Sequence, residues 1–299
     1  MDLLNENENL IIFLCKREGL NLEEFLAKQN LSKRLFRRLY RQKNIYVNGE
    51  FVRKDINLLK GDRVAIYMEN EEDDTRPEAM DLDILYEDYD MLVLNKPANM
   101  VVHPTKSHQT NTLSNGIAHY FKENNIKRKV RFVNRLDMDT TGVLIVAKNP
   151  FAHQQLALQF AANSVTRKYL TLVDGIVEKD EGLIDLPIGR KEEGSIRKVI
   201  DQNGQRALTR YIVRERFQNA SLLDVEIYTG RSHQIRVHLN SIGHPIIGDS
   251  LYNTKSSYIK RQALHSYYLA VKKVREDKEL KFTAPFPADI SSLIDLFRS

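Results

Sequence analysis

The sequence lacks several features, and each absence excludes a class of protein. Its 299 residues contain one cysteine, Cys15, so an intramolecular disulfide is impossible and a reducing compartment fits. No apolar run approaches the roughly 20 residues that a membrane-spanning helix needs. The first apolar run follows Glu6 and Glu8 instead of a basic segment, which is unlike a signal peptide. We therefore expect a cytoplasmic protein with no membrane-spanning segment.

Signatures of cofactor and metal sites are also missing. The sequence contains no P-loop, no dinucleotide-binding fingerprint, no Cys-x-x-Cys pair and no His pair at helical spacing. His233 and His238 lie close in sequence, but in a strand their odd separation would place them on opposite faces. We therefore expect neither a cofactor nor a metal.

The net charge of +5 conceals a strong segregation of charge along the chain. Residues 11–68 hold 13 Lys and Arg against 6 Asp and Glu, whereas residues 69–90 hold 1 against 11. The polar, aperiodic segment 69–81 predicts an acidic linker between a first domain at 11–68 and a second at 82–299. Two basic bodies joined by an acidic strip indicate a polyanionic partner, foremost nucleic acid.

The first domain is predicted to combine two helices with a hairpin. Apolar spacing predicts a helix over residues 20–29 with Asn21 as its N-cap, and a second helix that begins after the N-cap Ser32. The second helix has an apolar face and a cationic face, and no acid interrupts residues 33–43. An Asn-Gly turn then predicts a hairpin.

This order of elements resembles the S4 RNA-binding domain over most of residues 14–68. A cationic helix face can lie along a phosphate backbone and supply affinity without base specificity. The alternative is an ordinary solvated basic face. We favour RNA binding because no acid balances these cations, which are Lys33, Arg34, Arg37, Arg38, Arg41 and Lys43.

The second domain contains an acid just ahead of a short apolar run. Residues 134–142 read Asn-Arg-Leu-Asp-Met-Asp-Thr-Thr-Gly and precede the run Val-Leu-Ile-Val-Ala at 143–147. The run predicts a buried strand, and Gly142 suits a positive φ or the close approach of another backbone. Asp137 would then stand at the edge of a rigid core, which is a good position for chemistry.

This segment resembles the catalytic signature of the RluA-type family of RNA pseudouridine synthases, His-Arg-Leu-Asp-x-x-Thr-Ser-Gly. The resemblance implies that Asp137 is the catalytic aspartate. Two positions depart from the signature, with Asn134 in place of the usual His and Thr141 in place of Ser. Thr141 keeps a hydroxyl group, whereas Asn134 is polar but does not titrate.

Further segments extend the resemblance over about residues 83–290. Residues 95–104 resemble the family's Asn-Lys-Pro-x-Gly-x-x-Val-His-Pro segment, with Asn99 in place of Gly. The alternating strand 165–173 resembles the family's Lys-x-Tyr strand, and residues 229–239 resemble its Gly-Arg-Ser-His-Gln-Ile-Arg-Val-His segment. The implied site residues are Tyr169 as the active-site tyrosine, Arg236 as the ion-pair partner of Asp137, Ile235 beside it, and Arg135 and Arg231 as substrate contacts.

The implied reaction breaks the C1′–N1 bond of uridine and joins C1′ to C5, which needs no cofactor. Asp137 can attack C1′ as a nucleophile or abstract a proton from C2′, and the sequence leaves both routes open. Arg236 would favour the ionised aspartate and fix its rotamer. Tyr169 would stack on the extruded uracil and help to deprotonate C5.

We therefore predict an α+β protein, with a small α-rich S4-like domain followed by a mainly antiparallel mixed-sheet catalytic domain. The resemblance favours large-subunit ribosomal RNA as substrate, with transfer RNA second, and we expect a monomer. Two other functions stay open. One is a non-catalytic RNA-binding ribosome-assembly factor, and the other is a hydrolase that uses Asp137 and Asp139 with a metal.

Overall fold

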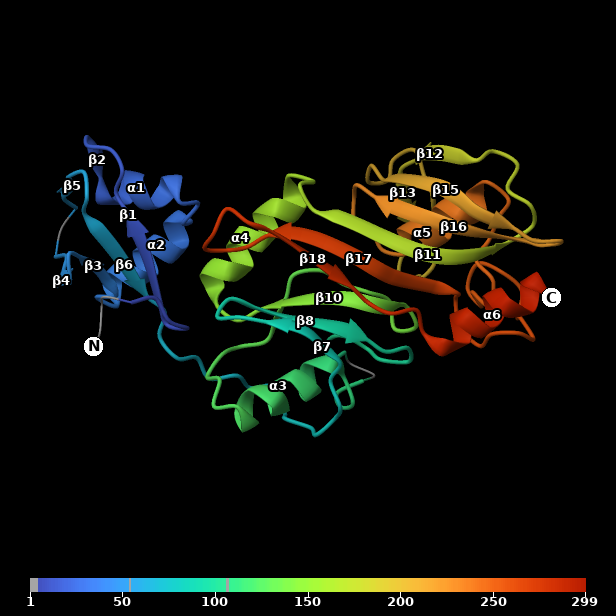
Figure 1. Ribbon diagram of the computed structural model, residues 1–299, viewed down its shortest axis with the longest axis horizontal. Coiled ribbons are helices and arrows are strands. Elements are labelled where there is room, and N and C mark those ends of the chain that lie inside the picture. The colour runs from blue at the N-terminus through green and yellow to red at the C-terminus, as the bar shows by residue number, and fades with distance from the viewer. Residues whose placement is uncertain (1–4, 54, 106–107) are drawn as a thin grey trace.

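The computed structural model describes residues 5–53, 55–105 and 108–299, which form a small N-terminal unit and a larger body (Figure 1). The N-terminal unit combines two helices with a four-stranded sheet of order β1-β6-β3-β4, while β2 pairs with β5. Its elements are β1 (Leu10–Leu14), β2 (Leu20–Asn21), α1 (Leu22–Lys28), α2 (Lys33–Arg41), β3 (Ile45–Val47), β4 (Glu50–Phe51), β5 (Asn57–Leu58) and β6 (Arg63–Tyr67). Strands thus contribute as much to this unit as helices.

Both helices of the N-terminal unit begin at the predicted caps. Asn21 Oδ1 accepts a hydrogen bond from Glu24 N at 2.8 Å, and the Glu24 carboxylate accepts one from Asn21 N. Ser32 Oγ accepts a hydrogen bond from Leu35 N at 3.3 Å. These bonds satisfy backbone donors that a helix leaves free at its first turn. The predicted apolar stripes are buried: Leu22, Phe25, Leu26, Leu35, Phe36 and Leu39.

The acidic segment 69–81 contains no helix or strand and lies against the larger body. Glu71 N donates to Lys127 O at 2.9 Å, and the Asp73 carboxylate accepts a hydrogen bond from Val130 N at 2.8 Å. These contacts attach the segment to the loop that follows the first helix of the body.

The larger body is built on a ten-stranded sheet of order β12-β15-β16-β11-β17-β10-β8-β7, with β18 beside β17 and β9 beside β10. In the described chain every pairing of this sheet is antiparallel except β10 with β17, which agrees with the predicted fold class. The elements are β7 (Ile84–Glu87), β8 (Met91–Lys96), α3 (Leu113–Glu123), β9 (Arg131–Phe132), β10 (Thr141–Ala147), α4 (Pro150–Ala161), β11 (Thr166–Asp174), β12 (Glu181–Asp185), β13 (Ile188–Arg190), β14 (Lys198–Ile200), β15 (Leu208–Arg216), β16 (Ala220–Ile227), α5 (Gln234–Ser241), β17 (Leu264–Lys272), β18 (Glu279–Thr283) and α6 (Ala288–Arg298).

Strand β10 is the rigid centre of this sheet. All seven of its residues are buried, and alternate side chains pack on opposite faces, where Leu144 lies in the core that includes α3 and Ile145 in the core that includes α4. Gly142 has φ of +113°, and a Cβ there would lie 2.1 Å from the Ser266 carbonyl oxygen. The positive φ and the close backbone approach predicted for Gly142 are therefore both present.

The segment after His233, considered as a strand in the sequence analysis, is the helix α5. His233 has φ of 57° and turns the chain, and the Gln234 side chain accepts hydrogen bonds from Arg231 N and from the Thr229 hydroxyl. Residues 234–239 are all buried, so the alternation of apolar and polar residues there does not separate a buried face from an exposed one and does not identify a strand. In the part of the chain that is described, no helix has the length and apolar character needed to cross a membrane.

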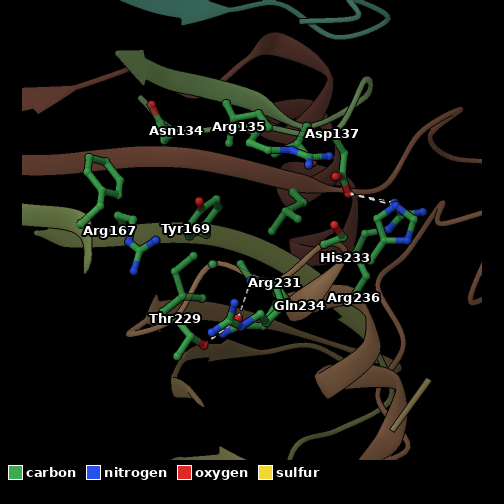
Figure 2. A pocket seen from close by; sticks show the side chains of 18 of the residues that line it. Asn134, Arg135, Asp137, Arg167, Tyr169, Thr229, Arg231, His233, Gln234 and Arg236 are labelled. Atoms are coloured by element: carbon green, nitrogen blue, oxygen red, sulfur yellow. Dashed lines mark hydrogen bonds and ion pairs between the residues drawn. The ribbon is translucent and has the colours of Figure 1, made fainter. Parts of the chain in front are cut away.

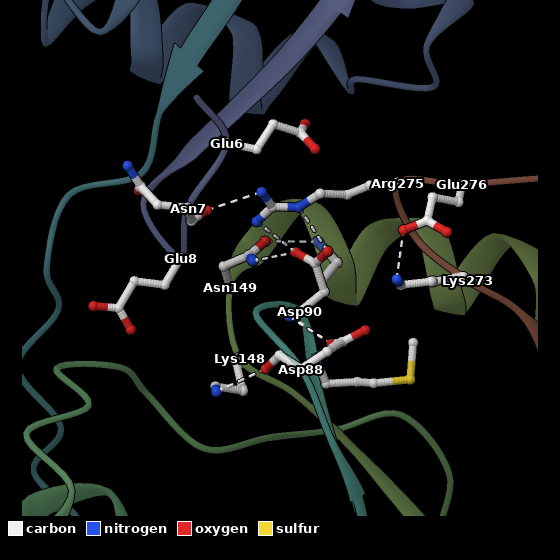
Figure 3. A network of polar contacts seen from close by, with 12 residues as sticks. Glu6, Asn7, Glu8, Asp88, Asp90, Lys148, Asn149, Lys273, Arg275 and Glu276 are labelled. Carbon is white, nitrogen blue, oxygen red and sulfur yellow. Dashed lines mark hydrogen bonds and ion pairs between the residues drawn. The ribbon is translucent and has the colours of Figure 1, made fainter. Parts of the chain in front are cut away.

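A charge network attaches the N-terminal unit to the larger body (Figure 3). Arg275 Nε lies 2.7 Å from Asp90 Oδ2, and its Nη1 donates to the carbonyl oxygens of Asn7 and Leu10 at 2.8 and 2.9 Å. Asn149 Nδ2 donates to Asp90 Oδ1 at 2.9 Å. The residue pair at the centre is buried, with 6% of the Arg275 side chain and 2% of the Asp90 side chain exposed.

Helix α4 supplies a second contact between the two parts. The ring of Phe151 lies edge-on to Phe13 at 5.7 Å between centroids and joins the core of the N-terminal unit. Gln154 Oε1 accepts a hydrogen bond from Ser32 N at 3.2 Å, at the N-cap of α2. Helix α2 is therefore positioned directly by a helix of the larger body.

Candidate active site and nucleic-acid interface

A cavity of about 440 Å³ opens where four segments meet (Figure 2). These segments are the loop before β10, the end of α4, the start of β11 and the loop that leads into α5. All the residues predicted for catalysis and substrate contact line this one cavity: Arg135, Asp137, Tyr169, Arg231, Ile235 and Arg236.

Asp137 lies in a turn directly before β10. Its carbonyl oxygen accepts a hydrogen bond from Thr140 N at 3.1 Å, and its side chain is 26% exposed toward the cavity. Arg236 Nη1 donates to Asp137 Oδ2 at 2.9 Å. The carboxylate therefore has a fixed cationic partner and remains accessible to a ligand.

Arg236 is itself held by a residue that the sequence analysis did not select. Asp249 is fully buried and accepts two hydrogen bonds from Arg236, at 2.7 Å from Nε and 2.7 Å from Nη2. The Arg236 guanidinium also lies 5.1 Å from the ring centroid of Tyr252. Burial opposes the charged form, but the hydrogen bonds and charges of Asp249 and Asp137 raise the pKa of Arg236. Arg236 is thus a permanent cation with a fixed orientation.

His233 approaches the same carboxylate oxygen of Asp137 as Arg236 does. Its Nε2 lies 3.9 Å from Asp137 Oδ2, and its Nδ1 lies 3.0 Å from the Tyr252 hydroxyl. Burial lowers the pKa of His233, in spite of the opposing charge of Asp137. His233 and His238 do not share a metal site, because His238 bonds Thr209 and the Leu186 carbonyl instead. The described residues contain no group of three or more potential ligands that could hold a metal.

Tyr169 forms part of the cavity wall on β11. It is 6% exposed, its hydroxyl bonds Ser266, and burial raises its pKa. Arg167 lies two residues earlier on the same strand, and Figure 2 shows the two side chains next to each other, away from Asp137. Arg167 was not among the predicted site residues, although its spacing of two from Tyr169 in an alternating strand places both side chains on one face.

Asn134, which replaces the usual histidine of the family signature, has a backbone-like role. Its Oδ1 accepts a hydrogen bond from Ile145 N at 2.8 Å, and its Nδ2 donates to Val143 O at 3.3 Å. The amide therefore continues the ladder between β9 and β10 by one further step. A side chain that does not titrate serves this position well.

Lys96, at the end of β8, supports the turn that carries Asp137. Its side chain is fully buried, and Nζ donates to the carbonyl oxygens of Pro97, Met100 and Met138 at 2.8, 3.0 and 2.7 Å. Burial lowers the pKa of Lys96 to about 7, against the attraction of Asp139 and Asp137. Because Met138 directly follows Asp137, these bonds hold the turn that carries Asp137 against β8.

A second cavity, of about 740 Å³, lies between α2 of the N-terminal unit and α4 of the larger body. Arg34, Arg37, Arg38 and Arg41 line it from α2, and Arg131, His153 and Gln154 line it from the body. In the described chain none of the four α2 arginines forms an ion pair, whereas Arg131 contacts Glu71 at 2.6 Å. We call this cavity the interdomain groove. Lys33 and Lys43, also predicted to contact RNA, do not line it.

Comparisons with known proteins identify the family of this chain. Residues 90–241 match the RNA pseudouridylate synthase family. The chain is 39% identical to an uncharacterized RNA pseudouridine synthase, YlyB, of Bacillus subtilis, over 93% of this chain and 94% of that protein. It is 35% identical to the ribosomal large subunit pseudouridine synthase D of Nitrosomonas europaea, over 98% of this chain and 90% of that protein.

A solved structure, that of human RNA pseudouridylate synthase domain containing 1, is 27% identical, with a TM-score of 0.56 over 73% of this chain and 95% of that chain. The chain belongs to the RNA pseudouridine synthase family of the RluA type, and the protein is therefore an isomerase that acts on RNA. This assignment replaces the two other functions left open above, the assembly factor and the metal-dependent hydrolase. The family match begins at residue 90 and does not include the N-terminal unit.

Proposed function

We propose that this protein converts specific uridines of large-subunit ribosomal RNA into pseudouridine, with Asp137 as the catalytic residue. The observation that carries the proposal is the contact of 2.9 Å between Asp137 and Arg236 in a cavity whose wall includes Tyr169. An accessible carboxylate with a fixed cationic partner is what either route to the new C1′–C5 bond requires.

In this proposal each residue acts at a different part of the nucleotide. Asp137 acts at the sugar, as a nucleophile toward C1′ or as a base toward C2′. Tyr169 stacks on the extruded uracil, and its hydroxyl helps to remove the C5 proton after the new bond forms. Arg236, with Ile235 beside it, holds Asp137 in place, while Arg135 and Arg231 contact the RNA near the uridine. Extruding the base costs roughly a few kcal/mol, which phosphate contacts elsewhere must offset.

The choice of ribosomal RNA rests on the relatives. Four related proteins, 32–38% identical to this chain, are named ribosomal large subunit pseudouridine synthase D. Those names describe the relatives, and we extend their substrate class to this chain as part of the proposal. Transfer RNA is the second candidate, because the chemistry at Asp137 is the same for either RNA.

We further propose that residues 11–68 act as an S4-like RNA-binding domain and that the interdomain groove holds the RNA backbone. The four α2 arginines that line the groove have no acidic partner in the described chain, so they are available to phosphates. Helix α4 borders the groove at Pro150 and His153, and it borders the catalytic cavity at Phe160 and Ala161. At 1.5 Å per residue, this run of α4 spans roughly 15 Å. RNA bound in the groove would therefore lie near the reacting uridine.

The test of the catalytic proposal is release of tritium from RNA that carries 5-³H-uridine. Bond formation at C5 must expel that hydrogen, so the assay measures the reaction itself. Large-subunit ribosomal RNA and transfer RNA transcripts are assayed side by side, with Asp137→Asn as the control. We expect release from the ribosomal transcript, reduced at least 1,000-fold in Asp137→Asn because a neutral amide is neither the nucleophile nor the base.

The outcomes separate the parts of the proposal. Release from transfer RNA alone would show that the chemistry is correct and the substrate class is wrong. Undiminished release by Asp137→Asn would show that another residue is the catalyst. If neither naked RNA reacts, assembled ribosomal particles are tested as substrates before the ribosomal proposal is abandoned.

A further inference from the structure

Arg167 is a buried arginine that has neither an acidic nor a hydrogen-bonding partner among the described residues. It is 7% exposed, and its Nε is buried with no hydrogen-bond acceptor within reach. No ion pair or hydrogen bond reaches the rest of its guanidinium from the described residues. An isolated buried charge is costly, so buried cations are normally paired with an acid. Arg167 therefore has an unused capacity to bind an anion.

The surroundings of Arg167 keep it inside the catalytic cavity. Its guanidinium lies 5.4 Å from the ring centroid of Phe160, at the end of α4. A Cβ at Gly230 would lie 3.1 Å from Arg167 Nη1, so the glycine leaves the space next to that nitrogen open. Burial lowers the pKa of Arg167, which agrees with a largely buried guanidinium that has no acid beside it in the described chain.

The other arginines of the cavity are already committed or exposed. Arg236 bonds two carboxylates, those of Asp249 and Asp137. Arg231 donates to the Arg206 carbonyl oxygen and to the Gln205 side chain. Arg135 is exposed, so water satisfies it. Among the four arginines that line the cavity, Arg167 alone is both buried and unpaired in the described structure.

We propose that Arg167 binds a phosphodiester group of the extruded uridine nucleotide. This inference rests on the proposed function, in which the cavity receives that nucleotide. The phosphodiester is the anionic group of a uridine nucleotide, and a guanidinium suits it because two N–H groups can bond two oxygens at once. Arg167 and Tyr169 are two residues apart on β11, or roughly 7 Å, so one would hold the phosphate while the other contacts the base.

Replacing Arg167 should weaken ligand binding without destabilising the folded protein. An arginine that supports the fold should destabilise the protein when it is replaced, whereas an unpaired buried cation should not. The variant Arg167→Met keeps much of the apolar stem and removes the charge. Arg261→Met is the matched control, because Arg261 is also 7% exposed but bonds the Asp289 carboxylate with two nitrogens.

The measurement is thermal unfolding of the full chain, alone and with two probes at equal concentration. The probes are uridine and uridine 3′,5′-bisphosphate, which share the base and differ in phosphate. In the unmodified protein we expect the bisphosphate to raise Tm more than uridine does, because a ligand of the folded state stabilises it by mass action. In Arg167→Met we expect this difference to disappear and the ligand-free Tm to be unchanged or higher. Arg261→Met should have a lower Tm.

Two results would overturn the proposal. One is a full bisphosphate-specific shift in Arg167→Met, and the other is a ligand-free Tm that falls as far as in Arg261→Met. Neither Tm measurement depends on turnover, so this test remains valid even if Asp137 proves not to be the catalytic residue.

A kinetic assay gives a second measurement. With an RNA that releases tritium, Arg167→Met should also raise KM roughly tenfold or more, the effect of one lost charge-assisted hydrogen bond. Arg167→Lys should recover part of that loss.

Discussion

The arginines of α2 and those of the catalytic cavity are arranged in opposite ways. In α2, Arg37 and Arg38 line the interdomain groove without an acidic partner in the described chain. In the cavity, Arg236 is buried and bonds Asp249 and Asp137 at 2.7 and 2.9 Å. An exposed, unpaired cation keeps its water until a partner arrives, so it contributes affinity and little to stability. A buried, paired cation fixes geometry and is costly to disturb.

Arg167 belongs to neither group, because it is buried like Arg236 and unpaired like Arg37. The comparison therefore distinguishes three uses of one residue type. In the functions proposed above, the paired arginine positions Asp137, the exposed arginines bind RNA phosphates, and Arg167 binds the phosphodiester of the substrate nucleotide. Substitutions of charged residues in these regions should therefore differ in their effects on stability, turnover and RNA binding.

Asp249→Asn should have the largest effect, because it removes the carboxylate that orients Arg236. The neutral amide leaves a buried guanidinium short of one partner, so the free energy of unfolding should fall by about 3–5 kcal/mol. Turnover in the tritium assay should fall about 100-fold through displacement of Asp137. Glu181→Gln is the control, since it breaks the exposed pair with Arg210 and should change neither quantity appreciably. Normal turnover in Asp249→Asn would show that Arg236 needs no such support.

Arg275→Met should loosen the attachment of the N-terminal unit. The change leaves Asp90 buried without its cation and removes hydrogen bonds to two backbone carbonyls of the N-terminal unit. We expect the free energy of unfolding to fall by about 3–4 kcal/mol. Hydrogen exchange should rise at residues 7–14, while the strand β10 stays protected. If hydrogen exchange at residues 7–14 is the same in Arg275→Met and in the unmodified protein, the contacts of α4 alone hold the N-terminal unit against the larger body.

His265 should make the larger body sensitive to acid. Burial lowers the pKa of His265 to about 4, in spite of its hydrogen bond to the Ala284 carbonyl. Between pH 6.5 and pH 4 the unfolded chain therefore binds a proton that the folded protein does not, so acid favours unfolding. From pH 7 to pH 4 this group should lower the free energy of unfolding by about 3 kcal/mol. Urea unfolding of His265→Gln at both pH values should lack this contribution, and an identical pH dependence in the two proteins would refute it.

The double variant Arg37→Gln/Arg38→Gln should have the smallest effect, confined to RNA binding. If each arginine contacts one phosphate, the slope of log K against log salt should decrease by about 1.4 for single-stranded RNA. The affinity should fall about tenfold at low salt. We expect kcat to be unchanged because neither residue lines the cavity that contains Asp137. Arg53→Gln/Lys60→Gln removes the same charge from exposed positions of the same unit that do not line the groove. Equal losses in the two double variants would indicate a diffuse charge effect instead of a groove.

Local patterns predicted much of the fold. Three predictions from neighbouring residues are confirmed: the helix caps Asn21 and Ser32, the buried strand at 143–147, and the positive φ of Gly142. The identity of α5 was not predictable in the same way. Its apolar residues Ile235, Val237 and Leu239 alternate with polar ones as they would in a strand, and this local alternation favours the wrong element. Residues 234–239 are all buried in the fold, so the polar positions do not mark a solvent-exposed face.

The sequence by itself determined the family, the aspartate ahead of a buried strand, and five residues that share the cavity with it, namely Arg135, Tyr169, Arg231, Ile235 and Arg236. Only the tertiary structure decided which charges meet, because pairing depends on contacts between segments far apart in the chain. Asp249 reaches Arg236 from the loop after α5, and Arg275 reaches Asp90 across 185 positions. The lack of a hydrogen-bonding partner for Arg167 Nε among the described residues is likewise not readable from the sequence, since it depends on every segment that packs around that side chain.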